Sequence, residues 1–122
     1  MSSLATKSIL VLAGLLGALG VMAAAMASHS GEARNVGAIA TIALAHAPVL
    51  LMLGLVRKGR MFDAAGAVLA FGTSLFVLDL GMRELWGHAF FPGAAPIGGG
   101  AMILGWLLIA AAGALYASKA SG

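Results

Sequence analysis

Four long apolar stretches, separated by short polar connections, constrain this chain more than any other feature of its sequence. They run roughly over residues 8–27, 36–56, 61–82 and 97–118. A helix needs about 20 mostly apolar residues to cross the roughly 30 Å hydrocarbon core of a bilayer. Because backbone amides in hydrocarbon must be hydrogen-bonded within their own segment, each stretch is predicted to be a membrane-spanning helix.

The composition excludes most other classes of protein. Charged residues make up 9% of the 122 residues and hydrophobic residues 61%, whereas soluble domains average about 25% charged residues. The seven Lys and Arg residues are scattered and form no basic face, which argues against binding of nucleic acid. The chain has no cysteine, so disulfides, thiolate metal sites and cysteine nucleophiles are excluded. The expected surroundings are therefore a lipid bilayer.

The connections and their charges predict the architecture. Short connections place neighbouring spans side by side and antiparallel, so residues 1–122 are expected to form a single all-α domain, an integral membrane four-helix antiparallel bundle. Five cations fall on one side, namely Lys7, Arg57, Lys58, Arg60 and Lys119, and two on the other, Arg34 and Arg83. The excess of cations on the cytoplasmic side of membrane proteins then places both termini in the cytoplasm.

The Gly- and Ala-rich composition favours a bacterial inner membrane, with a mitochondrial membrane as the alternative. Residues 25–27, Ala-Met-Ala, also have the form of a signal-peptide cleavage site. The apolar run before them is about 20 residues long, however, and the apolar part of a signal peptide usually has about 7–15. We therefore expect the first stretch to be a span.

His46 is the most informative polar residue, because it lies at the centre of the second apolar stretch. A neutral imidazole buried there needs one donor and one acceptor, and Thr73 or Ser74 on the third stretch could supply such a hydrogen bond. Pro48 has no N–H and leaves the carbonyl of Leu44 without its helical partner. A ligand, haem or proton-carrying role for His46 is the alternative to this structural hydrogen bond.

Asp79 and Arg83 stand four residues apart near the outer end of the third stretch, so their charges can pair on one helix face. An ion-binding carboxylate is the alternative. His29 ends the first stretch and is, with His46, a weak candidate for cofactor binding, although their different depths disfavour haem held between two histidines. The spacing of histidines and acids matches no metal or catalytic motif. We therefore predict no catalytic residue, no metal and no cofactor.

Small residues recur at four-residue spacing on the first and fourth stretches, where they would let helix backbones approach. They are Gly20, Ala24 and Ser28 on the first stretch and Ala101, Gly105 and Gly113 on the fourth, where Ile109 occupies the remaining position of the row. Pro96 can start the fourth helix, because its missing N–H would be unpaired there anyway. Gly98 and Gly99 would let another backbone come close at that end.

Trp106 lies about a third of the way into the fourth stretch, too deep for the aromatic belt at the membrane surface. Its indole N–H therefore needs an acceptor inside the protein. The carbonyl of Leu44 and the ring of His46 are the two candidates.

Four segments resemble a known family. They are residues 21–29 (VMAAAMASH), 45–51 (AHAPVLL), 71–76 (FGTSLF), and 95–99 (APIGG) followed by Gly105-Trp106. In these segments the chain resembles the small membrane proteins catalogued as domain of unknown function 423, whose eukaryotic relative is transmembrane protein 256. Thr73 and Phe76 stand where the family has Gly and Tyr, and Pro48 where it has Leu. The resemblance implies a four-helix inner-membrane protein and brings no catalytic residues.

The sequence thus predicts a small integral membrane protein without catalytic activity. We expect a structural or accessory subunit of a larger membrane complex, a respiratory one for example, or a homo-oligomer. Its partners would be the lipid bilayer and other membrane subunits or copies of itself. The alternatives are a haem- or quinone-binding membrane anchor, and a small transporter or proton pathway that uses His46 and Asp79.

Overall fold

The computed structural model describes residues 2–29 and 34–121, and the side chains among these as far as residue 116, so the side chain of Lys119 lies outside the described residues. Each apolar stretch forms one helix: α1 (Ser3–His29), α2 (Arg34–Val56), α3 (Arg60–Trp86) and α4 (Ala94–Ser121). All four are long and apolar enough to cross a membrane. The prediction of an all-α chain with four such helices is confirmed.

The helices extend a few residues beyond the predicted stretches. Apolar composition marks the part of a helix that lies in hydrocarbon, whereas backbone hydrogen bonding continues until a residue stops it. In α3 the stop is Gly87, which has a φ of 77° and donates its N–H to the carbonyl of Arg83. The helix therefore ends at Trp86, although its apolar stretch ends near residue 82.

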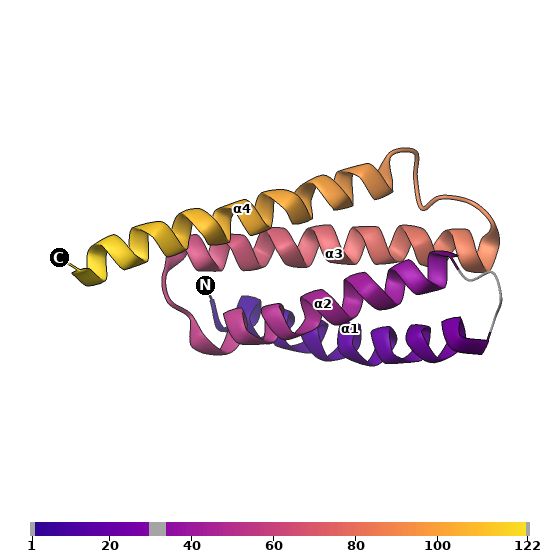
Figure 1. Cartoon of the computed structure of the whole chain (residues 1–122), viewed down its shortest axis with the longest axis horizontal. Coiled ribbons are helices and arrows are strands. Elements are labelled where there is room, and N and C mark those ends of the chain that lie inside the picture. The colour runs from indigo at the N-terminus through magenta and orange to yellow at the C-terminus, as the bar shows by residue number, and fades with distance from the viewer. Residues whose placement is uncertain (1, 30–33, 122) are drawn as a thin grey trace.

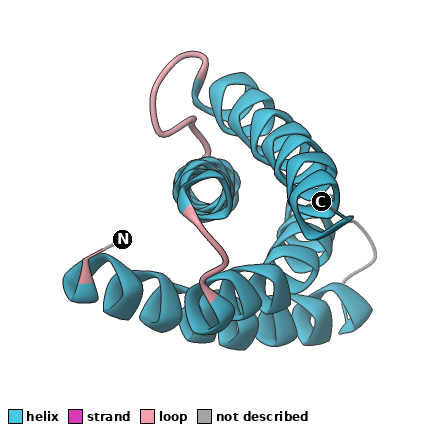
Figure 2. Ribbon diagram, turned by 90° about the vertical axis from the view of Figure 1, so that its left-hand side faces the viewer, coloured by secondary structure: helices cyan, strands magenta, loops and turns pink. Residues whose placement is uncertain are grey.

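The helices pack in chain order. In Figure 1, the N-terminal end of α1, the loop between α2 and α3 and the C-terminal end of α4 lie at one end of the molecule, and the loop of residues 87–93 lies at the other. The closest pairings are α1 with α2 and α3 with α4, and α2 packs less extensively on α3. Among the described residues the backbone of α4 contacts neither α1 nor α2, so the arrangement is an open one, as Figure 2 shows end-on.

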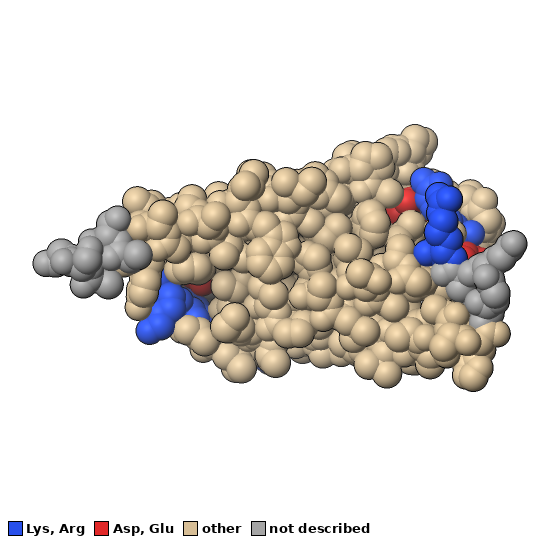
Figure 3. All heavy atoms as spheres, viewed as in Figure 1, with Lys and Arg blue, Asp and Glu red and all other residues tan. Residues whose placement is uncertain are grey.

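The interior lies mainly along α2 and α3. Ala43 and Leu50 of α2 and Ala65 and Leu69 of α3 are completely buried. Large apolar side chains also point outward on every helix, among them Leu15, Met52, Leu78 and Leu107, each more than half exposed. In Figure 3 the Lys, Arg, Asp and Glu side chains lie near the two ends, with an uncharged surface between them on this face. Such an exterior suits contact with lipid.

Glycines allow the close crossing of α3 and α4. A Cβ atom on Gly98 would lie 2.8 Å from the backbone nitrogen of Phe76 and 2.9 Å from the carbonyl oxygen of Gly72. A Cβ on Gly72 would in turn lie 2.7 Å from the carbonyl oxygen of Gly98. Gly105 continues this contact, because its Cβ would meet the side chain of Leu69 at 2.6 Å. Two backbones therefore touch where any larger residue would separate them.

The small-residue ridges predicted on α1 and α4 are used only in part. Gly20 is buried, and a Cβ there would meet Leu44 of α2 at 2.7 Å, but Ala24 and Ser28 are exposed. On α4 the close approach expected at both Gly98 and Gly99 is made by Gly98, since Gly99 has no atom within 4 Å of its Cβ position. Helical geometry explains the difference, because adjacent residues point about 100° apart.

Replacement of Gly98 by alanine should therefore destabilise the protein by about 1–3 kcal/mol, because the new methyl group meets backbone atoms that cannot turn aside. Unfolding of the purified protein in detergent would measure the loss. Gly99→Ala and Gly100→Ala are matched controls on the same turn, with open space at both Cβ positions. They should leave stability unchanged or raise it, and a similar loss in all three variants would refute the assignment.

Candidate functional site

A hydrogen bond between His46 and Trp106 joins α2 to α4 inside the molecule. The indole Nε1–H of Trp106 donates to His46 Nε2 over 3.1 Å. The two rings meet edge to face, with their centroids 5.8 Å apart. His46 Nδ1 lies 2.8 Å from the carbonyl oxygen of Ile42, one turn earlier in α2. Because Nε2 accepts and Nδ1 donates, this geometry fits a neutral imidazole with its proton on Nδ1.

Of the two acceptors considered for Trp106, the structure shows the ring of His46. The hydrogen bond considered from His46 to Thr73 or Ser74 is not formed, because both ring nitrogens are engaged elsewhere. Thr73 is fully buried, and its hydroxyl has no hydrogen-bond partner within the described residues. Ser74 is half-buried on the same helix. The ring of His46 thus reaches α4 rather than α3.

The two candidate cofactor ligands offer little as they stand. The lone pair of His46 Nε2 points at the Trp106 N–H, so a haem iron or metal ion could bind there only by displacing the indole. His29 is exposed at the end of α1. No group of three or more His, Asp or Glu side chains among the described residues is placed to hold a metal ion. The polar atoms of His46 are thus used for internal structure.

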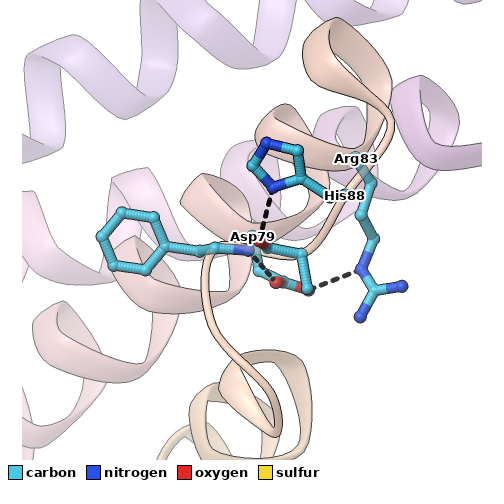
Figure 4. A network of polar contacts seen from close by, with 5 residues as sticks. Asp79, Arg83 and His88 are labelled. Carbon is cyan, nitrogen blue, oxygen red and sulfur yellow. Dashed lines mark hydrogen bonds and ion pairs between the residues drawn. The ribbon is translucent and has the colours of Figure 1, made fainter.

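A second polar cluster lies near the C-terminal end of α3 (Figure 4). It is centred on Asp79, which is completely buried. Asp79 Oδ2 accepts a hydrogen bond of 2.8 Å from Arg83 Nε, and Oδ1 accepts one of 2.9 Å from the backbone N–H of Phe90. The ion pair expected between Asp79 and Arg83 is present. His88 contacts the carbonyl of Ala89 instead of the carboxylate, so it does not extend the cluster.

The Asp79 cluster positions the start of α4. Phe90 belongs to the loop that carries the chain from α3 back to α4, and its N–H is tied to α3 by the buried carboxylate. The N–H of Ala94 then bonds to the carbonyl of Phe91, and α4 begins. Pro96 lies in this first turn, two residues after the start of the helix, where its missing N–H removes no hydrogen bond. Asp79 therefore acts as an anchor for a loop.

Beside the His46–Trp106 bond, an apolar groove of about 510 Å³ opens between α2 and α4. Its walls come from the second half of α2, the start of α3 and the part of α4 from Trp106 to Tyr116. Arg57 and Lys58 of the α2–α3 loop line one end. Trp106 lines this groove and is 43% exposed. The sequence did not predict the groove. The groove arises because α2 and α4 are separated, whereas the pattern of apolar residues shows only which face of each helix points to the core.

An ion pair between Arg57 and Asp63 was also not predicted from the sequence. Arg57 pairs with Asp63 across the α2–α3 loop at 3.7 Å. The short spacing of these opposite charges around Gly59 was a usable signal.

Comparison with known proteins gives a family and no structural neighbour. The model of a family described as "Protein of unknown function (DUF423)" matches residues 16–99. This range takes in the second half of α1, all of α2 and α3 and the start of α4. Gly105 and Trp106 lie beyond it. No solved structure matches the chain.

Loss of Arg83 should harm the protein more than neutralisation of Asp79. Arg83→Ala leaves a fully buried carboxylate without its cation, which costs about 3–5 kcal/mol. Asp79→Asn keeps an oxygen that can accept from Phe90 and leaves a half-exposed arginine, for about 1–3 kcal/mol. Detergent unfolding of both variants, with His88→Ala as a near-neutral control, would test this order, and the reverse order would show that the buried carboxylate does not depend on Arg83 for charge compensation.

Removal of the indole donor should destabilise the fold modestly. Trp106→Phe leaves His46 Nε2 without its donor, and hydrogen bonds between membrane helices are worth about 0.6–1.7 kcal/mol. The same measurement on Trp86→Phe is the matched control, because Trp86 is exposed at the end of α3. Equal stability of the two variants would show that the bond contributes nothing.

Proposed function

We propose a structural role from the premise that this chain belongs to the DUF423 family, whose function is unknown. The protein is a non-enzymatic membrane subunit that associates, through the outward face of α4, with other membrane proteins or with copies of itself. The observation that carries this proposal is that, among the described parts of the chain, the backbone of α4 lies against the backbone of α3 alone.

The exposed side of α4 supports an interface there. The face toward α3 is made by small or buried residues such as Gly98, Met102 and Gly105. The opposite face presents Ile103 and Leu107, which are 64% and 62% exposed. A helix held along one face leaves the rest of its surface for lipid or for a neighbouring span, and packing between spans is driven by close van der Waals contact.

The internal use of the polar residues supports a role without chemistry. Both nitrogens of His46 and both oxygens of Asp79 are engaged in hydrogen bonds within the same chain. For each residue one of the two bonds reaches another element, Trp106 of α4 for His46 and Phe90 of the α3–α4 loop for Asp79. A proton carrier or ligand site would need at least one of these atoms to exchange its partner. Their observed partners instead hold α4 and its preceding loop in place.

The charges support an orientation in the bacterial inner membrane. Lys7, Arg57, Lys58 and Arg60 belong to the end of the molecule where α1 begins and α4 ends, and Arg34 and Arg83 belong to the other end. By the positive-inside rule the first end faces the cytoplasm. Labelling of a Ser2→Cys variant from outside intact cells by an impermeant thiol reagent would contradict this orientation.

Cysteine cross-linking in native membranes tests the proposed interface. The natural chain has no cysteine, so each introduced one is unique. Ile103→Cys and Leu107→Cys should give a cross-linked species of discrete mass, either a dimer of this chain or an adduct with one partner subunit. The matched control is Leu15→Cys, because Leu15 is 63% exposed on α1.

The control variant should remain monomeric under the same conditions. Absence of any cross-link at both α4 positions would refute the proposal, and so would cross-linking of equal extent at Leu15, which would indicate random collision in the bilayer. Identification of the adduct by mass spectrometry distinguishes a homo-oligomer from an accessory subunit.

A further inference from the structure

We propose that the groove between α2 and α4 binds one acyl chain of an anionic phospholipid, whose headgroup lies against Arg57 and Lys58. This site is separate from the outward face of α4, and it does not depend on the proposed subunit role. The argument rests on the shape, the lining and the charge of the groove.

The groove has the dimensions of a site for one leaflet. Its lining on α4 runs from Trp106 to Tyr116, which spans about 15 Å at 1.5 Å per residue. That is half of the roughly 30 Å hydrocarbon thickness. Its volume of about 510 Å³ lies within the range of about 300–1,000 Å³ typical of small-molecule sites. The groove therefore fits a chain that enters from one membrane surface and stops near the midplane.

The lining is apolar along its length and differs at its two ends. Val49, Met52 and Leu53 of α2 face Ile109 of α4 across the groove. At the inner end stands Trp106, whose N–H is already bonded to His46 and is not available to a ligand. The walls thus offer van der Waals contact and no free polar partner at this depth, which suits hydrocarbon rather than the polar head of a molecule.

The end of the groove at the α2–α3 loop is cationic. Arg57 and Lys58 line it, and both are exposed, as is the neighbouring Arg60. Asp63, which pairs with Arg57 at 3.7 Å, is the acid beside them. The two lining cations against the one negative charge of Asp63 leave a net charge of +1 at the mouth. Juxtamembrane Lys and Arg residues attract anionic headgroups, so the charge selects a phospholipid with a negative head over a zwitterionic one.

Fluorescence quenching of Trp106 by brominated lipids tests the proposal directly. Trp86→Phe leaves Trp106 as the single tryptophan of the full chain. This variant would be placed in phosphatidylcholine nanodiscs that contain, at equal mole fraction, acyl-brominated phosphatidylglycerol or acyl-brominated phosphatidylcholine. We expect the phosphatidylglycerol to quench Trp106 at least two-fold more strongly, and 1 M salt to reduce this preference by screening the headgroup.

Variants at the two ends of the molecule identify the cause. Arg57→Gln combined with Lys58→Gln should abolish the preference, and Arg34→Gln at the opposite end should retain it. Since all three side chains are exposed, circular dichroism should show an unchanged fold. Native mass spectrometry of the protein from mixed-lipid nanodiscs should show one retained phosphatidylglycerol, lost in the double variant.

Equal quenching by the two lipids would overturn the proposal, because the groove would then be filled by bulk lipid. A preference that survives in the double variant would overturn it too. Saturable quenching by a short-chain benzoquinone, without any lipid preference, would assign the groove to a quinone instead.

Discussion

The hydrogen bond between Trp106 and His46 is the interaction on which the position of α4 relative to α2 depends. The backbones of these helices do not touch, so this side-chain contact spans a gap that packing leaves open. In hydrocarbon there is no water to replace a lost partner, which restrains both rings. The same contact fixes the histidine tautomer, closes the inner end of the groove and removes the imidazole lone pair from other uses.

Close backbone packing and a polar anchor both contribute to the α3–α4 contact. Gly72 and Gly98 bring the two backbones together at one level, and Gly105 packs against Leu69 farther along. Asp79 then holds the loop that returns the chain to this crossing. The glycines allow the two backbones to approach but do not fix where α4 begins, and the carboxylate of Asp79 does so by holding the preceding loop. Helices in lipid need both, because no hydrophobic effect pulls them together.

The sequence predicted the helices well because span length and backbone satisfaction are local requirements. The Asp79–Arg83 pair was also predictable, since residues four apart share a helix face. For His46 the sequence suggested Thr73 or Ser74 as partner, and it suggested the ring of His46 as one of two acceptors for Trp106. The structure shows the bond to Trp106, which is sixty residues away. The choice between α3 and α4 depends on helix rotation and tilt.

The groove and the open side of α4 could not be predicted from the sequence. Both depend on which helices fail to touch, and a pattern of apolar residues is the same whether lipid or another helix covers it. The glycines illustrate this limit. Gly98 and Gly99 are adjacent in the sequence, yet one lies against a backbone and the other faces open space.

The pairing of helices in chain order has a consequence for biosynthesis. The most extensive contacts join α1 to α2 and α3 to α4. The two hairpins meet at the less extensive α2–α3 contact and are linked by residues 57–59. The crossings of Gly20 with Leu44 and of Gly54 with Leu10 lie wholly within the first hairpin. The hairpin of α1 and α2 can therefore assemble in the bilayer while the ribosome is still translating α3. The hairpin of α3 and α4 then packs against the surface of α2 that has already formed.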